Sequence, residues 1–422
     1  MEKYKARIVD SMLDFKLRSK GAVLIEGPKW CGKTTTASQF AGSILLMQED
    51  ARQNIELADL DPGRLLQGET PRLIDEWQIA PQLWDAVRVE VDRRDAFGQF
   101  MLTGSAVPPD TEKIRHSGTG RITRLKMRPM SLFESGESSG AVSLSHLFSG
   151  EHEITGDSAA KLDDVAFWIC RGGWPKAIEQ PTDIALQQAI DYYDAVAGVD
   201  ISRVDDVERN ESRTRRLLRS YARFVGSQAK IPSIIGDMKA NDVENLSDAT
   251  VRSYLGALEK LFVIENAPAW NPNLRSKAAI RTSDTRYFTD PSIAAAALGI
   301  GPHDLTNDLE TMGLFFENLC IRDLRVYAEK LDGSIYHYRD RNGLECDAVI
   351  HRRNGTYGLI EIKLGGDRLI EEAAKTLTAL TEQIDHGKMK APSFRMILTA
   401  TGCYAYKRKD GILIVPLACL KD

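Results

Sequence analysis

The chain has 422 residues, of which 43% are hydrophobic and 27% are charged, and its formal net charge is −5. This length predicts about three domains of ~150 residues each, and the composition excludes a disordered or fibrous protein. The acidic balance is no general sign of a nucleic-acid partner. Any such partner must therefore be argued from local basic patches.

Cysteine usage and the N-terminal residues indicate the compartment. No cysteine stands in a CxxC or Cys/His spacing, which argues against both a disulfide framework and a structural zinc and suits a reducing compartment. The first ten residues, MEKYKARIVD, are charged, and no run reaches the ~18 apolar residues of a membrane span. The sequence thus predicts a cytoplasmic protein without membrane contact.

The most informative stretch is residues 22–40, AVLIEGPKWCGKTTTASQF. An apolar strand-like run precedes the pattern GxxxxGKT, and the residues after it suit a helix. This order predicts a P-loop, because backbone N–H groups can surround a β-phosphate only where glycine permits the tight turn. A chance match in an ordinary loop is the alternative, which the flanking strand and helix disfavour.

The P-loop predicts an ATP site. Lys33 would reach the β- and γ-phosphates, Thr34 would place its hydroxyl on Mg²⁺, and the N-terminus of the following helix would favour the phosphate charge. The predicted nucleotide-binding residues are Gly27, Pro28, Lys29, Trp30, Cys31, Gly32, Lys33, Thr34 and Thr35.

A second short apolar run, at residues 72–78, ends in two acids and reads RLIDEWQ. About forty residues after Lys33, this pattern is typical of a Walker B segment, in which Asp75 holds Mg²⁺ through water and Glu76 orients or deprotonates the attacking water. A solvated strand end is the alternative. The alternation of strands and helices predicts a mainly parallel sheet with nucleotide at the carboxyl ends of its strands.

Four segments in fixed order, GPKWCGKT, LIDEWQ, FMLTGSA and GRITRLKMRPMSLFE, resemble the bacterial and archaeal family of AAA-type ATPases that carry a C-terminal domain of unknown function. In that family a Gly-Arg pair and a later Pro-x-Ser-x-x-Glu follow the sensor strand, here Gly120-Arg121 and Pro129 to Glu134. The resemblance spans essentially the whole chain. It implies an ATPase core followed by further domains.

The resemblance also implies roles for polar residues after the Walker B segment. A polar residue at the end of strand 99–103 senses the γ-phosphate in AAA-type ATPases, so Thr103 or Ser105 is a candidate, although a plain turn is equally compatible. Arg121 and Arg124 follow a Gly-rich loop. Arg121 is a candidate arginine finger, acting in cis or from a neighbouring copy, because phosphoryl transfer builds negative charge on the γ-phosphate. Surface cations are the alternative for both arginines.

The middle of the chain predicts a linker and then a DNA-associated module. Residues 136–157 are rich in Gly, Ser and Glu, and Gly172 to Pro175 resembles the family's Gly-Gly-x-Pro turn, to which no chemistry is assigned. Helices are predicted at 213–226, at 231–239 and from an N-cap at Ser247, and two strands then flank a basic loop. The basic residues of that loop are Arg275, Lys277, Arg281 and Arg286. This is the order of a winged helix, and a spacer or a protein-binding module is equally compatible.

The last part of the chain carries a second set of chemical residues. Asp347 stands on one predicted strand, Glu361 and Lys363 lie on the same face of the next strand, and Glu317 lies on a preceding helix. Asp347 and Glu361 could hold Mg²⁺, Glu317 could complete or orient the metal, and Lys363 could polarise a water for phosphodiester hydrolysis. A salt-bridged core with the same residues is the alternative.

This constellation resembles the active site of restriction-endonuclease-like enzymes with the PD-(D/E)xK arrangement, and it matches the C-terminal domain of the family at Glu317, at Glu345-x-Asp347 and at Glu361-x-Lys363. The predicted fold class is α/β. A P-loop AAA-type core with a parallel sheet occupies residues 1–135, a linker and helical lid 136–204, a winged helix 205–304 and a nuclease-like α/β domain 305–422.

The predicted function is that of an ATP-hydrolysing, Mg²⁺-dependent protein that acts on DNA. The alternative is a nucleotide-dependent switch whose C-terminal domains bind a partner protein without catalysis. ATP is the predicted ligand, and a homo-oligomer is a possible assembly, because an arginine finger from a neighbour would require one.

Overall fold

The computed structural model describes residues 4–104, 117–205, 207–240, 247–273, 280 and 282–422. The chain forms two compact units, each built from separate segments. The first unit comprises Met1–Pro129, Ala195–Glu211 and Ser253–Val263, and the second comprises Met130–Asp194, Ser212–Arg252 and Ile264–Asp422. This division differs from the four consecutive domains that the sequence predicts.

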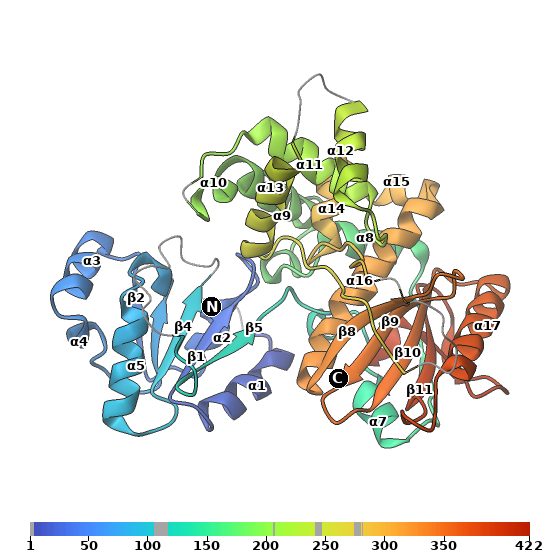
Figure 1. Ribbon diagram of the computed structural model, residues 1–422, viewed down its shortest axis with the longest axis horizontal. Coiled ribbons are helices and arrows are strands. Elements are labelled where there is room, and N and C mark those ends of the chain that lie inside the picture. The colour runs from blue at the N-terminus through green and yellow to red at the C-terminus, as the bar shows by residue number, and fades with distance from the viewer. Residues whose placement is uncertain (1–3, 105–116, 206, 241–246, 274–279, 281) are drawn as a thin grey trace. The chain divides into compact units, whose positions relative to one another are not determined.

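The first unit is built on a five-stranded parallel sheet in the order β2-β3-β4-β1-β5 (Figure 1). Its strands are β1 (Ala22–Glu26), β2 (Ser43–Leu46), β3 (Arg72–Asp75), β4 (Phe100–Gly104) and β5 (Ile122–Lys126). Its helices include α1 (Ile8–Leu17), α2 (Lys33–Ser38), α3 (Ala51–Leu60), α4 (Pro62–Leu65) and α5 (Leu83–Arg94). The predicted parallel sheet is confirmed.

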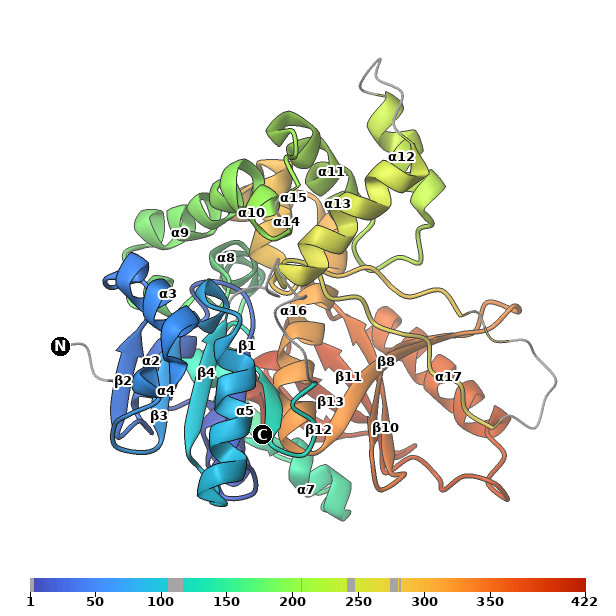
Figure 2. The same ribbon diagram turned by 60° about the vertical axis from the view of Figure 1, so that its left-hand side comes forward.

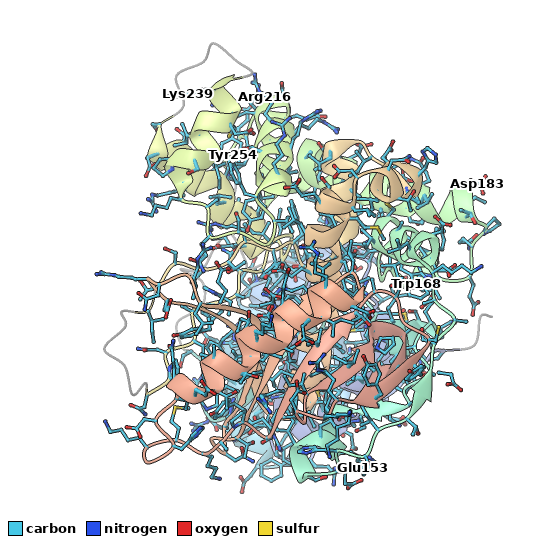
Figure 3. All side chains as sticks on the ribbon, turned by 90° about the vertical axis from the view of Figure 1, so that its right-hand side faces the viewer. Glu153, Trp168, Asp183, Arg216, Lys239 and Tyr254 are labelled. Carbon is cyan, nitrogen blue, oxygen red and sulfur yellow. The ribbon has the colours of Figure 1, made fainter. Side chains whose placement is uncertain are left out.

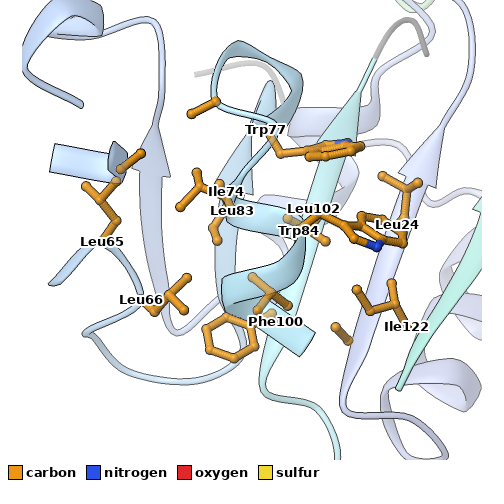
Figure 4. Close-up of a cluster of buried hydrophobic side chains, with 14 of the residues drawn as sticks. Leu24, Leu65, Leu66, Ile74, Trp77, Leu83, Trp84, Phe100, Leu102 and Ile122 are labelled. Carbon is orange, nitrogen blue, oxygen red and sulfur yellow. The ribbon is translucent and has the colours of Figure 1, made fainter. Parts of the chain in front are cut away.

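Apolar side chains on both faces of the central strands hold this unit together. On one face, α5 covers β1 and β4 (Figure 2), and Trp77 and Trp84 pack with Leu24 and Leu102 in a buried apolar cluster (Figure 4). On the other face, α1 and α2 pack against alternate residues of the same strands. A strand buried on both faces needs a continuous apolar run, which is what residues 22–25 and 100–102 provide.

The first unit also contains a helical piece far along the chain. It consists of a π-helical turn, Val196–Asp200, followed by α10 (Ile201–Arg203). Asp200 ends the π-helical turn and is almost fully buried. Residues 195–211 therefore belong with the P-loop and not with the rest of the predicted lid.

The second unit contains a long helix, α16 (Leu309–Lys330), and a seven-stranded mixed sheet in the order β7-β12-β13-β11-β10-β9-β8. Its strands are β7 (Gly156–Asp157), β8 (Gly333–Arg339), β9 (Glu345–Arg352), β10 (Tyr357–Lys363), β11 (Phe394–Thr399), β12 (Tyr404–Lys407) and β13 (Leu413–Pro416). Helix α17 (Asp367–Gln383) lies across this sheet (Figure 3). The predicted hairpin between Asp347 and Glu361 is confirmed as the β9–β10 pair.

The predicted linker is in part a component of the second unit. Strand β6 (Val142–Ser143) pairs with the C-terminal β14 (Leu420–Lys421), and β7 pairs with β12. Two-residue strands are too short to show a period-two pattern. The sequence therefore predicted only a linker from the Gly- and Ser-rich composition of this segment. The α-helices of residues 130–195 are α6 (Leu132–Ser135), α7 (Leu144–Ser149), α8 (Leu162–Arg171) and α9 (Thr182–Ala195).

The elements predicted as a winged helix occur in the expected order. They are α11 (Glu211–Arg223), α12 (Ile231–Ala240) and α13 (Asp248–Lys260), and the hydroxyl of Ser247 caps α13 by accepting from the Thr250 N–H at 3.0 Å. The predicted strands are reduced to isolated antiparallel bridges at Ile264–Phe288 and Ala267–Thr285. Arg275, Lys277 and Arg281 lie outside the described residues.

A buried ionic network explains the Gly-Gly-x-Pro turn. Asp290 caps α14 (Pro291–Leu298), and its Oδ2 accepts both from the Gly173 N–H at 2.9 Å and from Arg322 Nη1 at 3.0 Å. A Cβ on Gly173 would lie 2.2 Å from the carbonyl oxygen of Met130. Only glycine fits there, so the turn is a packing device that ties the segment after β5 to α14 and α16.

Replacing Arg322 by methionine is expected to destabilise the second unit. Arg322 is 1% exposed and also bonds Asp323 through Nε at 2.8 Å, so its loss leaves two buried carboxylates without their cation. Breaking a buried pair in this way costs about 3–5 kcal/mol. Thermal unfolding should show a large drop in midpoint, whereas Arg368→Met, which breaks an exposed pair on α17, should change it little. Equal midpoints for the two variants would contradict the prediction.

Candidate functional site

The first candidate site lies at the carboxyl edge of the parallel sheet. Strand β1 ends at Glu26 and leads directly into the P-loop, while β3 ends at Asp75 and β4 carries Thr103 near its end. Because β4 lies between β1 and β3, Thr103 stands between the P-loop and the Walker B acids. Parallel strands thus gather at one edge residues that are up to about eighty positions apart in the sequence.

The P-loop has the backbone conformation that glycine permits. Gly32 has φ +99° and precedes the first turn of α2, and a Cβ on Gly27 would lie 2.0 Å from the carbonyl oxygen of Met127. Lys33 is 5% exposed, and its ammonium donates to the carbonyl oxygens of Gly27 at 3.0 Å and Pro28 at 2.8 Å. The predicted phosphate-binding lysine is therefore folded onto the loop itself.

Two hydroxyl groups, one from α2 and one from β4, converge on one carboxylate oxygen at the end of β3. Thr34 Oγ1 and Thr103 Oγ1 each donate to Asp75 Oδ1 at 2.6 Å. A hydroxyl and a carboxylate are hard oxygen ligands of the kind that Mg²⁺ takes, so the donor set suits the predicted metal. Of the two sensor candidates, Thr103 makes this contact, and Ser105 lies outside the described residues.

Glu76 has a left-handed backbone conformation, with φ 54°. Its N–H donates to Thr103 Oγ1 at 3.3 Å, and its carboxylate accepts from the side-chain amide of Gln78. A non-glycine residue in this region is uncommon and is found at functional sites. The Glu76 backbone is thus bonded to Thr103, and its carboxylate is held by the side-chain amide of Gln78, two residues further along the chain.

Three further P-loop residues differ in how they are placed. The Lys29 ammonium lies 2.7 Å from Asp200 Oδ1, so this lysine is paired with the π-helical turn of the same unit. Trp30 has φ 64° and is 46% exposed, and Thr35 is exposed on α2. Their contacts with nucleotide stay predictions.

The structure does not bring Arg121 to the P-loop. Strand β5 runs parallel to β1 with Ile122 beside Ala22, so Arg121 lies at the edge where β1 begins, about 16 Å of strand away from the loop. Its guanidinium pairs with Asp92 on α5 at 2.7 Å, and Arg124 pairs with Glu26. A finger acting in cis does not fit this placement, and one acting on a neighbouring copy stays a prediction.

The second candidate site lies between β9 and β10. The register of these strands, continued by one residue, sets Asp347 opposite Glu361. The Lys363 ammonium lies 2.9 Å from Asp347 Oδ2 and 2.8 Å from Glu361 Oε2, and Asp347 also accepts from the Ile362 N–H at 2.7 Å. The structure therefore brings three of the four predicted residues into direct contact.

Glu317 makes a different contact from the one predicted. It accepts a hydrogen bond from the hydroxyl of Tyr287, a fully buried residue that the sequence did not single out. Burial and then the charge of Asp347 raise the pKa of Glu317 to about 8. Burial likewise raises the pKa of Glu361 well above its usual range.

Family models match three parts of the chain. An AAA domain matches residues 19–135, and two domains of unknown function, DUF8612 and DUF4143, match residues 162–304 and 312–420. Residues 19–135 form an AAA-type P-loop core. The strand order and the convergence on Asp75 agree with that assignment. DUF4143 covers the whole Glu317–Lys363 cluster without assigning it a chemistry.

Whole-chain similarities are more distant. Uncharacterised proteins of Mycobacterium bovis and Mycobacterium tuberculosis are each 23% identical over 344 residues, which cover 81% of this chain and 70% of those proteins. A Walker-type ATPase of Pyrococcus abyssi aligns with a TM-score of 0.42 and 14% identity over 70% of this chain and 96% of that chain. A RuvB variant of Thermotoga maritima aligns at 0.26, with 15% identity over 62% and 89%. Both scores are low, so the assignment of the core rests on the AAA match and the strand order.

None of the helices in the described residues is both long and apolar enough to span a bilayer. Within the same residues, no three His, Cys, Asp or Glu side chains gather closely enough to hold a metal ion. The predicted role of Glu317 in completing or orienting the metal stays a prediction. Glu361 Oε1 is nevertheless buried without a hydrogen-bond partner, so one carboxylate oxygen remains to suit a cation.

The raised pKa of Glu317 predicts how stability depends on pH. Between its ordinary value of 4.5 and about 8, the folded state holds a proton that the unfolded state has lost. Stability should therefore fall as pH rises through this window, by at most about 1.4 kcal/mol per pH unit for one group. Urea unfolding of wild type and Glu317→Gln at pH 5 and pH 8, in a chelator, measures the effect. The wild type should lose more stability than the variant, and equal losses would contradict the prediction.

Proposed function

We propose that this chain hydrolyses ATP at the AAA-type core and uses the nucleotide cycle to control a DNA-directed C-terminal domain. The observation that carries the proposal is the convergence of Thr34 and Thr103 on Asp75 beside the buried Lys33. In this proposal Thr34 and, through water, Asp75 would hold Mg²⁺, which would supply neutralising charge to the β- and γ-phosphates. Lys33 leaves the carbonyl oxygens of the loop to contact the phosphates.

Within this site, Glu76 is proposed to act on the attacking water. Its carboxylate accepts from Gln78 while its N–H is bonded to Thr103, so it must exchange the amide for water to act as a base. Thr103 contacts both the carboxylate proposed to bind the metal and the backbone N–H of the residue proposed to orient the water, so it holds the two residues in register.

The C-terminal domain is proposed to be a nuclease of the PD-(D/E)xK kind. The proposal is supported by the opposed Asp347 and Glu361, by Lys363 between them and by the unpartnered oxygen of Glu361. Asp347 and Glu361 would hold Mg²⁺, which would supply Lewis acidity for phosphodiester hydrolysis. Lys363 would then be freed to hold a water or to neutralise the developing charge.

One observation favours a second candidate function. Lys363 neutralises both carboxylates at hydrogen-bond distance, which is also the arrangement of a salt-bridged core. In that case the chain is a nucleotide-dependent switch whose second unit binds a partner protein and has no catalytic activity.

The two candidates differ in whether DNA affects ATP turnover. We expect duplex DNA to stimulate Mg²⁺-dependent ATP hydrolysis by wild-type protein, and raising salt from about 50 to 200 mM to weaken DNA binding steeply, because phosphate contacts release counterions. Slow, DNA-independent turnover with tight nucleotide retention would instead support the switch. Isothermal calorimetry with MgATP that shows no heat of binding would remove both.

A further inference from the structure

A buried arginine from outside every nucleotide-binding motif contacts the back of the P-loop. Arg7 is 7% exposed, and its Nη1 donates to the carbonyl oxygen of Cys31 at 2.9 Å. Its Nη2 donates to the carbonyl oxygen of Arg128 at 2.9 Å, in the segment just after β5. One guanidinium therefore bridges the P-loop and the strand end behind it.

The arginine is itself held in place by its own segment. The Arg7 N–H donates to Asp10 Oδ2 at 2.8 Å, and Asp10 Oδ1 accepts from the Tyr4 hydroxyl at 2.7 Å. Tyr4 also lies within 3.0 Å of the Thr36 hydroxyl on α2, the helix that follows the loop. The segment from Tyr4 to Asp10 is thus attached to the P-loop and to its helix at separate points.

The geometry of the peptide bond relates the contact between Arg7 and the Cys31 carbonyl to nucleotide binding. The carbonyl of Cys31 and the N–H of Gly32 belong to one planar trans peptide and point in opposite directions. A donor that fixes the carbonyl on the outer side of the loop therefore fixes the N–H on the inner side. A P-loop binds phosphate through N–H groups that point inward, and the cation polarises this N–H further.

We propose that Arg7 is a positioning residue of the nucleotide site, which holds the Cys31–Gly32 peptide with its N–H directed toward the β-phosphate before nucleotide arrives. Gly32 has φ +99°, in a region where glycine has wide freedom, so an external constraint on this peptide removes motion that binding would otherwise have to freeze. The inference rests on the proposed binding of ATP at the loop.

The test compares Arg7→Ala with Arg18→Ala in calorimetric titrations with MgADP and with the magnesium complex of a non-hydrolysable ATP analogue. Arg18 directly follows α1, as Arg7 directly precedes it, and forms an exposed pair with Asp14, so it is the matched control. We expect Arg7→Ala to raise the Kd for both nucleotides about 10-fold, because both carry a β-phosphate, and Arg18→Ala to leave both unchanged. In steady-state ATP hydrolysis, the KM for ATP should rise, and kcat, the rate at saturating ATP, should change less.

Arg7→Lys keeps the charge and guards against a variant that does not fold. A single ammonium lacks the planar fork that bridges two carbonyl oxygens, so this variant should recover only part of the affinity. Hydrogen exchange of residues 29–34 without nucleotide is measured in parallel and should be faster in both Arg7 variants. Hydrogen exchange without nucleotide can be measured whether or not the wild type binds ATP. A wild type that does not bind ATP would instead remove the proposed function. Folded Arg7 variants with wild-type Kd or wild-type exchange would overturn the proposal.

Discussion

Lys33→Ala is expected to reduce ATP turnover at saturating MgATP by about 10²–10³-fold, the range seen when one preorganised charge-stabilising donor is removed. The ammonium is buried beside the loop, and the transition state of phosphoryl transfer places charge on the γ-phosphate within its proposed reach. Steady-state release of phosphate is the measurement. Lys16→Ala, in the last turn of α1, is the matched control and should retain wild-type turnover.

The same variant tests what Lys33 does before nucleotide binds. Its ammonium now satisfies the carbonyl oxygens of Gly27 and Pro28, so alanine leaves both without this donor. We therefore expect weaker nucleotide binding as well as slower chemistry. A Lys33→Ala protein that hydrolyses ATP at the wild-type rate would remove the assignment of the site.

The sequence predicted the AAA-type P-loop core because the patterns that indicate it are contiguous. The P-loop pattern GxxxxGKT and the Walker B pattern RLIDE can each be recognised within about ten consecutive residues. A parallel sheet then brings the ends of their strands to one edge. Thr103 was predicted only as one of two candidates for sensing the γ-phosphate, and its contact with Asp75 was not predicted. A single polar residue at a strand end carries no pattern that fixes which hydroxyl faces the neighbouring strand.

The position of Arg121 could have been predicted from the direction of the strands in the sequence. Arg121 directly precedes β5, and the P-loop directly follows β1. In parallel neighbours, a residue before one strand and a loop after the other must lie at opposite edges of the sheet. Chain direction alone therefore argues against Arg121 as a finger in cis, whatever its distance in sequence from the Walker motifs.

Arg7, Asp200 and Tyr287 illustrate what sequence patterns could not supply. Each reaches its partner from a remote segment: Arg7 contacts Cys31, Asp200 contacts Lys29, and Tyr287 contacts Glu317. None belongs to a spacing that chemistry requires, so nothing distinguishes them from ordinary polar residues until the chain is folded. The β9–β10 hairpin was predictable because alternation and a turn signal fix its register.

Lys363→Ala is expected to abolish Mg²⁺-dependent DNA cleavage, with loss of at least about 100-fold in rate. The ammonium is the one cation within hydrogen-bond distance of both Asp347 and Glu361 among the described residues, so its removal leaves the developing phosphate charge without that donor. Cleavage of labelled plasmid and linear DNA by the full chain, with and without ATP, is the measurement. Lys375→Ala, an exposed lysine on α17 of the same unit, should cut like the wild type.

The same substitution separates a nuclease from a salt-bridged core. In a nuclease, two carboxylates freed of Lys363 should still bind Mg²⁺, so the metal should raise the unfolding temperature of the variant more than that of the wild type. In a structural core, the variant should lose stability because the opposed carboxylates repel, and Mg²⁺ should not restore it. A wild-type chain that cuts no DNA, together with a Lys363→Ala variant that Mg²⁺ cannot stabilise, would leave the second unit as a binding domain controlled by the ATPase core.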